Sequence, residues 1–301
     1  LSSQNAGLLN GQSAALFDIS YYNSFSDAEN AANPLPSNFS NTSNPQTIYA
    51  TVTNNQNPDC YDIASFQLVV HPKPVINLAP EYILCEGSTV SINAQAGFSS
   101  YLWSNGSTSP NVVINQAGNY TLQTTLSYGS VICESTQNFV VTDSNIATIS
   151  SIDLSDWTDN NNTITINVTG TGQYEYSLDG NIYQESNQFS GLLPGLYNLY
   201  VNDMNGCGLI TEEVFLLMYP HFFTPNGDGF NDLWHIKLVS YEPGLTVEIY
   251  DRYGKFITNY TGMKEGWDGT LNGEELPSSD YWFVVKRVSG KEYRGHFSLK
   301  R

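Results

Sequence analysis

The sequence predicts an all-β protein made of several small domains, and three observations support this. First, only 13% of the 301 residues are charged, about half the usual share, and Asn, Ser, Thr, Gly and 20 Tyr take their place. Second, short alternating runs of Val, Ile, Leu, Thr and Tyr are separated by turn formers, a pattern that favours strands over helices. Third, one cysteine spacing recurs along the chain. Because 40% of the residues are hydrophobic, the chain can build cores, and general disorder is excluded.

The recurring cysteines are Cys60, Cys133 and Cys207, which are separated by 73 and 74 residues. Each is followed by a polar step and then by an apolar strand. A period of this length predicts tandem domains, each large enough for a small β-sandwich. Proline and polar residues punctuate the joints between them. The sequence therefore predicts four domains, at 1–73, 74–144, 145–218 and 219–301.

The second and third domains share further features. A Trp-bearing strand runs into an Asn-Gly turn at 101–106, and a turn feeds a strand at 117–122 and again at 194–200. These stretches resemble the PKD-like and immunoglobulin-like modules of bacterial surface proteins. The resemblance implies that the first three domains are immunoglobulin-like or PKD-like β-sandwiches.

The cysteines also raise the question of disulfides. Cys85 and Cys133 fall in one predicted domain, and we expect them to join an early strand to a late one. Closing a loop of that length stabilises by about 4 kcal/mol in the chain-entropy model, and an oxidising compartment permits the bond. Cys60 and Cys207 have no partner within their own domains, so they are either buried thiols or paired across domains. No Cys or His stands near them at ligand spacing, so no metal is expected there.

Charge is distributed unevenly. Residues 1–219 contain one basic residue, Lys73, against 18 acidic ones, whereas residues 220–301 contain 10 basic and 11 acidic residues. This step indicates two regions with different roles. The acidic region should repel nucleic acid and anionic membranes, so no nucleic-acid partner is expected.

We expect neither a membrane-spanning helix nor an N-terminal signal peptide in this chain. No apolar run approaches the roughly 18 residues that a spanning helix needs, so we do not expect the chain itself to span a membrane. Polar residues follow Leu1, with neither a basic n-region nor an apolar h-region, so no signal peptide is expected. We interpret the chain as a fragment or mature piece of a longer protein.

The last eighty residues differ in their pattern. A loop dense in turn formers is expected at 219–232, followed by strands over 245–250, 256–257, 281–285 and 296–299. Turns separate these strands at 251–255, 267–269 and 272–273. About seven short strands in this span predict another small sandwich.

Several motif blocks occur in this segment in a fixed order, at 222–232, 249–255, 266–270, 276–283 and 294–301. With these blocks the segment closely resembles the type B C-terminal domain of the type IX secretion system, also called the gliding motility-associated C-terminal domain. The resemblance implies a folded tag that carries a protein through the outer membrane of Bacteroidota after a separate N-terminal peptide has brought it to the periplasm.

The resemblance also implies partners and a location. A PorV-type shuttle and a SprA-type translocon would recognise the tag, and an outer-membrane protein of the PorP/SprF type would retain the product at the cell surface. Large gliding adhesins of the SprB type end in this way, so the chain resembles the tail of a surface adhesin. The residues expected to contact these partners come from the motif blocks and the terminus: Pro225, Asn226, Gly227, Asp228, Gly229, Asn231, Asp232, Arg252, Gly254, Trp267, Asp268, Gly269, Tyr281, Trp282, Arg294, Gly295, His296, Phe297, Leu299, Lys300 and Arg301.

Basic residues also gather near the terminus. They are Lys286, Arg287, Lys291, Arg294, Lys300 and Arg301. A positive final strand could pair with an acidic or backbone-edge site on a partner, as in β-augmentation. Alternatively, these charges keep an edge strand soluble.

The stretch 226–232 resembles a calcium loop, because oxygen-bearing side chains alternate with glycines, and Asp228 and Asp232 are its candidate ligands. It lacks the full EF-hand spacing and the distal Glu. The alternative is a turn in which Asp and Asn side chains bond their own backbone. Apart from this structural calcium, no cofactor is expected.

No catalytic motif is present. The sequence has no nucleophile elbow, zinc-protease pair or phosphate-binding loop, and His221, His235 and His296 match no ligand spacing. We therefore expect no enzyme. Two other hypotheses stay open: an accessory carbohydrate-binding region of a secreted polysaccharide-degrading enzyme, and a hydrolase hidden in residues 1–217.

Overall fold

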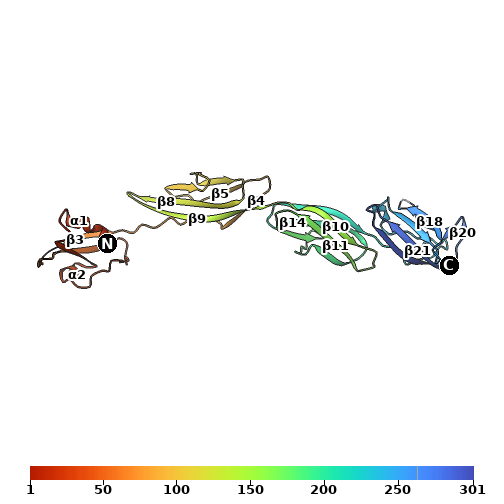
Figure 1. Ribbon diagram of the computed structural model, residues 1–301, viewed down its shortest axis with the longest axis horizontal. Helices are drawn as coiled ribbons and strands as arrows, with labels where there is room; N and C mark the ends of the chain where they lie inside the picture. The colour runs from red at the N-terminus through yellow and green to blue at the C-terminus, as the bar shows by residue number, and fades with distance from the viewer. Residues whose placement is uncertain (263) are drawn as a thin grey trace. The chain divides into compact units, whose positions relative to one another are not determined.

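The computed structural model describes residues 1–262 and 264–301, and strands dominate both ranges (Figure 1). The all-β prediction is confirmed. Helical structure is confined to a few short pieces, and none of the described helices has the length and apolar character needed to cross a membrane.

The chain divides into two compact units, which are described separately. One unit comprises residues 1–78, 93–112 and 121–138, and the other comprises residues 79–92, 113–120 and 139–301. The four predicted domain boundaries stay predictions.

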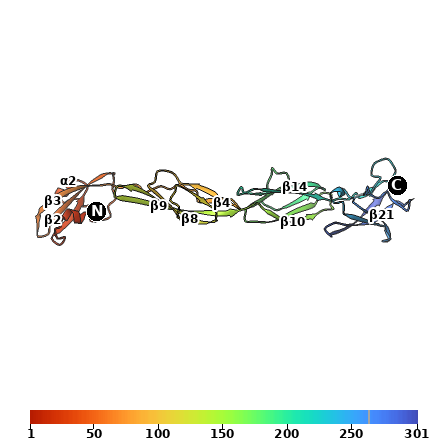
Figure 2. The ribbon, with the colours of Figure 1, turned by 90° about the horizontal axis from the view of Figure 1, so that it is seen from above.

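The first unit begins with a single antiparallel sheet in the order β1-β2-β3. Its elements are η1 (Ser2–Gln4), α1 (Asn5–Leu9), β1 (Phe17–Tyr22), α2 (Phe25–Glu29), β2 (Gln46–Asn54) and β3 (Asn57–Leu68). Figures 1 and 2 show α2 and these strands at the red and orange end of the colour range. Ser24 caps α2, because its Oγ accepts the N–H of Asp27 at 3.0 Å. The buried side chains of Tyr21, Ile48 and Ala50 form the core, with Leu8 of α1 packed against them. Helices and loops thus stand where the sequence predicted a second sheet.

Six strands follow in the next part of the chain. They are β4 (Glu81–Cys85), β5 (Val90–Asn93), β6 (Ser100–Trp103), β7 (Asn111–Ile114), β8 (Gly118–Tyr128) and β9 (Val131–Ser144). They form a sheet in the order β4-β9-β8-β6 and a two-stranded β5-β7 sheet. β4 runs parallel to β9, with Glu81 opposite Val140 and Cys85 opposite Ser144.

Residues 145–217 form two three-stranded sheets, in the orders β10-β11-β13 and β12-β14-β15. The strands are β10 (Thr148–Ser155), β11 (Asn162–Thr169), β12 (Tyr174–Ser177), β13 (Gln188–Leu192), β14 (Gly195–Asp203) and β15 (Leu209–Leu216). Their fully buried residues include Ile164 and Ile166 of β11 and Leu199 and Val201 of β14. In β11 and β14 alternate residues are buried, as expected of strands in a sandwich.

The C-terminal domain is built on a five-stranded sheet in the order β16-β22-β21-β17-β18. Its elements are β16 (Phe222–Phe223), η2 (Val239–Tyr241), β17 (Thr246–Tyr250), β18 (Phe256–Thr261), β19 (Thr270–Leu271), β20 (Glu274–Glu275), β21 (Ser279–Lys286) and β22 (Glu292–Leu299). β18 and β21 are labelled at the blue end of Figure 1. Along β21, Tyr281 and Phe283 are buried, whereas Asp280 and Trp282 are exposed. One face of the sheet therefore packs on the core, and the other faces solvent.

Candidate recognition site in the C-terminal domain

The loop at 222–232 is held by its own acidic side chains. The Asp232 carboxylate accepts backbone N–H groups of Gly227 at 2.7 Å, Gly229 at 2.7 Å and Asn226 at 2.9 Å. These bonds, led by that from Gly227, lower the pKa of Asp232 below its usual value. Gly227 and Gly229 have φ values of +77° and +86°, which favour glycine.

Asp228, the other candidate calcium ligand, is used in the same way. Its carboxylate accepts the N–H of Phe230 at 2.8 Å and the side-chain amide of Asn226 at 2.9 Å. The geometry is that of the self-bonded turn weighed against calcium in the sequence. Within residues 1–262 and 264–301, no group of three or more His, Cys, Asp or Glu side chains could hold a metal ion.

We therefore predict that chelation with EDTA leaves the melting temperature of the chain unchanged, because both carboxylates are already satisfied by N–H donors. Calorimetry with and without added Ca²⁺ measures this. As a control, Asp232→Ala should lower the melting temperature of the C-terminal domain equally in EDTA and in Ca²⁺. A drop in EDTA that Ca²⁺ reverses would restore the calcium-loop interpretation.

Arg301 ties three motif blocks together. Its guanidinium donates to the carbonyl oxygens of Pro225 at 3.3 Å, Gly269 at 3.2 Å and Leu276 at 3.2 Å. It also forms an ion pair of 3.1 Å with Glu275. The resemblance predicts that Arg301 contacts a partner, but in the structure its side chain turns inward onto its own domain.

Four other predicted contact residues form the core. Trp267, Tyr281, Phe297 and Leu299 are all at least 96% buried. The Trp267 indole donates to the carbonyl oxygen of Thr270 at 2.9 Å, so even its polar atom is engaged. The prediction that these four side chains touch a partner is therefore corrected, because in aromatic-rich strands every second residue belongs to the core.

Several predicted glycines and turn residues also serve the fold. A Cβ at Gly295 would lie 2.7 Å from the ring of Phe283, and one at Gly269 would lie 2.7 Å from Leu299. Gly254 has a φ of +80° in the turn between β17 and β18.

The remaining predicted residues divide between turns and the solvent. Asp268 caps its turn by accepting the N–H of Thr270 at 3.0 Å, and Asn231 has a φ of +53°. The Lys300 ammonium lies 4.3 Å from the ring centre of Phe222. Arg252, Trp282, Arg294 and His296 are exposed, and Trp282, Arg294 and His296 lie on the outer face of the sheet.

The C-terminal domain shares a core with the strands before it. Trp157 stacks on Tyr293 at 4.7 Å between ring centres, and burial raises the pKa of Tyr293 to about 12. Arg287 pairs with Asp156 at 2.8 Å and with Glu242 at 2.9 Å. The prediction that Arg287 belongs to a basic recognition cluster is therefore wrong, because its acidic partners lie 131 and 45 residues away and no local pattern indicates them.

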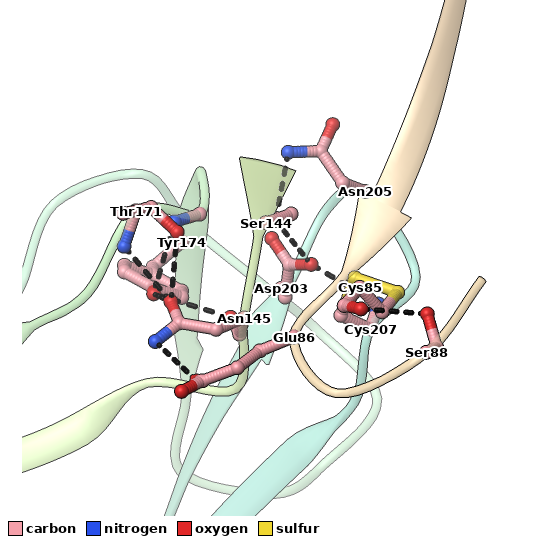
Figure 3. Close-up of a disulfide and its surroundings, with 11 residues drawn as sticks. Cys85, Glu86, Ser88, Ser144, Asn145, Thr171, Tyr174, Asp203, Asn205 and Cys207 are labelled. Atoms are coloured by element: carbon pink, nitrogen blue, oxygen red, sulfur yellow. Dashed lines mark hydrogen bonds between the residues drawn. A yellow bond between two sulfur atoms is a disulfide. The ribbon is translucent and has the colours of Figure 1, made fainter. Parts of the chain in front are cut away.

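The predicted disulfide between Cys85 and Cys133 is wrong. Cys85 is bonded to Cys207, which lies in the turn between β14 and β15 (Figure 3). The parallel pairing of β4 with β9 sets Cys85 beside Ser144, the last residue of β9, whereas Cys133 lies eleven residues earlier in the same strand. At about 3.3 Å per residue, these two positions are roughly 36 Å apart along β9, far beyond disulfide reach. Cys60 is an exposed free thiol and Cys133 a partly buried one.

Polar contacts surround the disulfide, as Figure 3 shows. Ser144 donates its hydroxyl to Asp203 at 2.8 Å, and the N–H of Cys207 donates to the same carboxylate at 3.0 Å. Asn145 donates to Glu86 at 3.3 Å. The bond therefore belongs to an ordered polar junction between the end of β9 and the β14–β15 turn.

Comparison with known proteins gives matches for both ends of the chain. Residues 1–74 match the Flavobacterium inter-domain disulphide bond domain, and residues 217–299 match the CHU_C Type IX secretion signal domain. The only cysteine in the first range is Cys60, so the Cys85–Cys207 bond lies outside that match. No curated protein matches the chain.

Among solved structures, the chain is similar to the N-terminal eight Ig domains of Down Syndrome Cell Adhesion Molecule, at 12% identity and a TM-score of 0.32 over 94% of this chain and 45% of that one. It is also similar to an I-band fragment of titin, at 11% identity and a TM-score of 0.31 over 77% of this chain and 99% of that one. This chain thus spans less than half the length of the first of these structures.

The family match and the motif blocks coincide. The CHU_C match at residues 217–299 includes all five blocks except the last two residues of the final one, and a signal of this kind implies export to the cell surface or the extracellular space. The C-terminal part of the chain, residues 217–299, is therefore a type IX secretion signal domain, as its type B motif blocks predicted.

Proposed function

We propose that the chain is the C-terminal region of a secreted cell-surface adhesin, and that its last domain directs both export and retention at the outer membrane. The type IX signal at residues 217–299 is the observation that carries the proposal. The all-β domains before it are acidic, since residues 1–219 contain a single basic residue. They provide an acidic spacer of the kind expected between an adhesive region and its anchor.

The partners follow from this role. A PorV-type shuttle and a SprA-type translocon would carry the protein across the outer membrane of a Bacteroidota cell, and a PorP/SprF-type protein would hold it there. We also propose that the chain has no catalytic activity of its own, since its sequence contains no catalytic motif.

The carbohydrate-binding alternative requires exposed aromatic rings on residues 74–217, where sugars could stack. In this stretch, which is fully described, every Trp, Tyr and Phe side chain is buried or half-buried, and none of its exposed large hydrophobic residues is aromatic. This favours the adhesin proposal over the accessory-region alternative.

The test is export of a reporter in a Bacteroidota host. A periplasmic reporter is fused to residues 145–301, so that the contacts of Trp157 and Asp156 with the signal domain are kept, and a matched reporter carries residues 145–216 alone. We expect protease added to intact cells to digest the first reporter and spare the second, which should accumulate in the periplasm. Equal surface exposure of both reporters would refute the proposal.

A further inference from the structure

Four aromatic side chains form one row across the outer face of the C-terminal sheet. Strand register places Tyr250 of β17 opposite both Phe256 of β18 and Trp282 of β21, and Trp282 opposite His296 of β22. Their neighbours in each strand, such as Ile249 and Phe297, are buried, so the row faces solvent. At about 4.8 Å between strands, the row extends over roughly 14 Å. We call it the aromatic row.

Two rings of the aromatic row are well exposed. Phe256 is 50% exposed and Trp282 is 43% exposed. The ring centres of Tyr250 and Phe256 are 5.8 Å apart with an interplanar angle of 76°, and those of Trp282 and His296 are 5.9 Å apart at 36°. The rings are therefore not coplanar and do not provide the flat platform that a chain of sugars would stack on.

A groove of about 630 Å³ lies beside the row, lined by Tyr250, Trp282, Arg252 and Arg294 among others. Its third cation, Lys286, is already neutralised by Glu248 at 2.9 Å. The guanidinium of Arg252 lies 5.0 Å from the ring centre of Tyr253. Within residues 1–262 and 264–301, Arg252 forms no ion pair. Arg294 reaches only Glu292 of its own strand, at 3.4 Å, and stays exposed. The carboxylates of Glu248, Asp251 and Glu292 also line the groove, so its formal charges balance. What it offers a partner is the unpaired guanidinium of Arg252, the exposed guanidinium of Arg294 and the exposed indole of Trp282.

This combination fits a protein partner. Trp, Tyr and Arg are the residues that most often dominate protein–protein binding energy, and guanidinium groups bind carboxylates in a bidentate manner. The other polar groups of the motif blocks are already used within the domain, since Asp228 and Asp232 bond their own loop and Arg301 binds three carbonyl groups. The aromatic row and its groove are part of the surface that these internal contacts leave open, together with the exposed rings of Tyr253 and Phe230.

We propose that the aromatic row with Arg252 and Arg294 is the surface through which the signal domain binds an acidic loop of an outer-membrane component of the type IX apparatus. The inference rests on the proposed function, since it names the reading surface of the same signal. An apolar side chain of the loop packs on Trp282, and its carboxylates pair with the two arginines. Binding should weaken as salt is raised, because both arginines are exposed.

The experiment uses the full chain, immobilised and exposed to detergent-solubilised outer membranes of a Bacteroidota cell, with captured type IX components quantified by mass spectrometry. Trp282→Ala and the double variant Arg252→Gln/Arg294→Gln should each reduce capture by about tenfold or more, the effect of a hot-spot side chain. Val288→Ala and Lys291→Gln are the matched controls. They remove an exposed apolar side chain and an exposed cation outside the groove, and should capture as the unchanged chain does.

Wild-type capture of a type IX component with undiminished capture by both variants would overturn the inference and leave the proposed function intact. No capture by the wild-type chain, together with failed export of the reporter above, would overturn both. If Trp282→Ala lowers the melting temperature, the arginine double variant decides alone, because its side chains lie on the surface. A further outcome is that the variants lose binding to an acidic polysaccharide, or lose self-association, and still capture type IX components. Either result would refute the assignment of this surface to a type IX partner.

Discussion

Replacement of Cys207 by serine is expected to destabilise the region around residues 145–217 by up to about 5 kcal/mol, the value that the chain-entropy model gives for a closed loop of this length. The bond joins Cys85 to Cys207 across a sequence separation of 122 residues. Such a cross-link restricts the unfolded chain over both the end of β4 and the whole following sandwich. Loss of the disulfide should therefore lower the stability of segments that lie well beyond the two cysteines.

Hydrogen exchange measured by mass spectrometry suits this test, because it reports the opening free energy of each segment of a multidomain chain. Peptides from β14 and β15 should lose protection in Cys207→Ser and in the reduced wild-type chain. The polar junction of Ser144, Asp203 and Asn145 survives the substitution and limits the loss. Cys133→Ser is the matched control: this thiol is partly buried but forms no disulfide, so the opening free energy should change by about 1 kcal/mol or less.

Two results would contradict this account. One is a peptide map of the oxidised protein in which Cys85 is linked to Cys133, as the sequence alone suggested. The other is an equal loss of protection in Cys133→Ser and Cys207→Ser, since the structure gives Cys133 no sulfur partner.

The error in the disulfide shows where sequence reasoning reaches its limit. Placing Cys85 and Cys133 in one domain was reasonable from spacing, but the pairing depends on the parallel register of β4 with β9. That register is set by contacts between strands more than fifty residues apart, and no local pattern encodes it. Four cysteines allow three pairings, and spacing alone cannot choose among them.

The alternation of apolar residues predicts the strands better than the cysteine spacing predicts the disulfide. The predicted strands at 281–285 and 296–299 lie within β21 and β22, because alternation of apolar residues has a local physical cause. Where both faces of a strand carry aromatic rings, the alternation of residues does not tell which face is buried. Tyr281 and Trp282 are adjacent, yet the first lies in the core and the second in solvent. For this reason the predicted contact residues divide into core, turn and surface groups.

The motif blocks led to a second error, because all of their prominent residues were expected to contact a partner. Residues of a motif block need not touch a partner, since Arg301 and Asp232 both bind groups of their own domain. The sequence shows that these side chains are special, and the structure shows that their task is to hold three loops in place. The recognition surface that we propose is smaller and lies on the open face of the sheet.

Replacement of Arg287 by methionine is expected to lower the free energy of unfolding of the C-terminal domain by about 3–5 kcal/mol, the usual effect of removing one partner of a buried ion pair. The side chains of Arg287, Asp156 and Glu242 are only 12%, 6% and 10% exposed. Methionine fills a similar volume but leaves two buried carboxylates without their cation. Because Asp156 lies just before Trp157, which stacks on Tyr293, the loss should also loosen the contact between the signal domain and the preceding strands.

The loss of unfolding free energy in Arg287→Met should depend on pH, and its direction can be stated. Burial raises the pKa of Asp156, while Arg287 opposes the rise, so in Arg287→Met this pKa should be higher still. A carboxyl whose pKa is raised on folding contributes stability that is present at low pH and is lost as the pH rises through the folded value. The difference between variant and wild type should therefore be largest near neutral pH and shrink as the solution is acidified toward the usual carboxyl range. Hydrogen exchange of β21 and β22 at several pH values measures it.

Two further variants separate charge burial from packing. Lys291→Gln removes an exposed cation of the adjacent turn and should have no measurable effect. Arg287→Met combined with Asp156→Asn and Glu242→Gln removes the stranded charges and should recover part of the lost stability, because neutral groups of similar shape are cheaper to bury than unpaired ions. A single Arg287→Met variant as stable as wild type, or a deficit that does not change with pH, would mean that the ion pairs do not hold the signal domain to the preceding strands. The reporter would then need no residues before 217 for export.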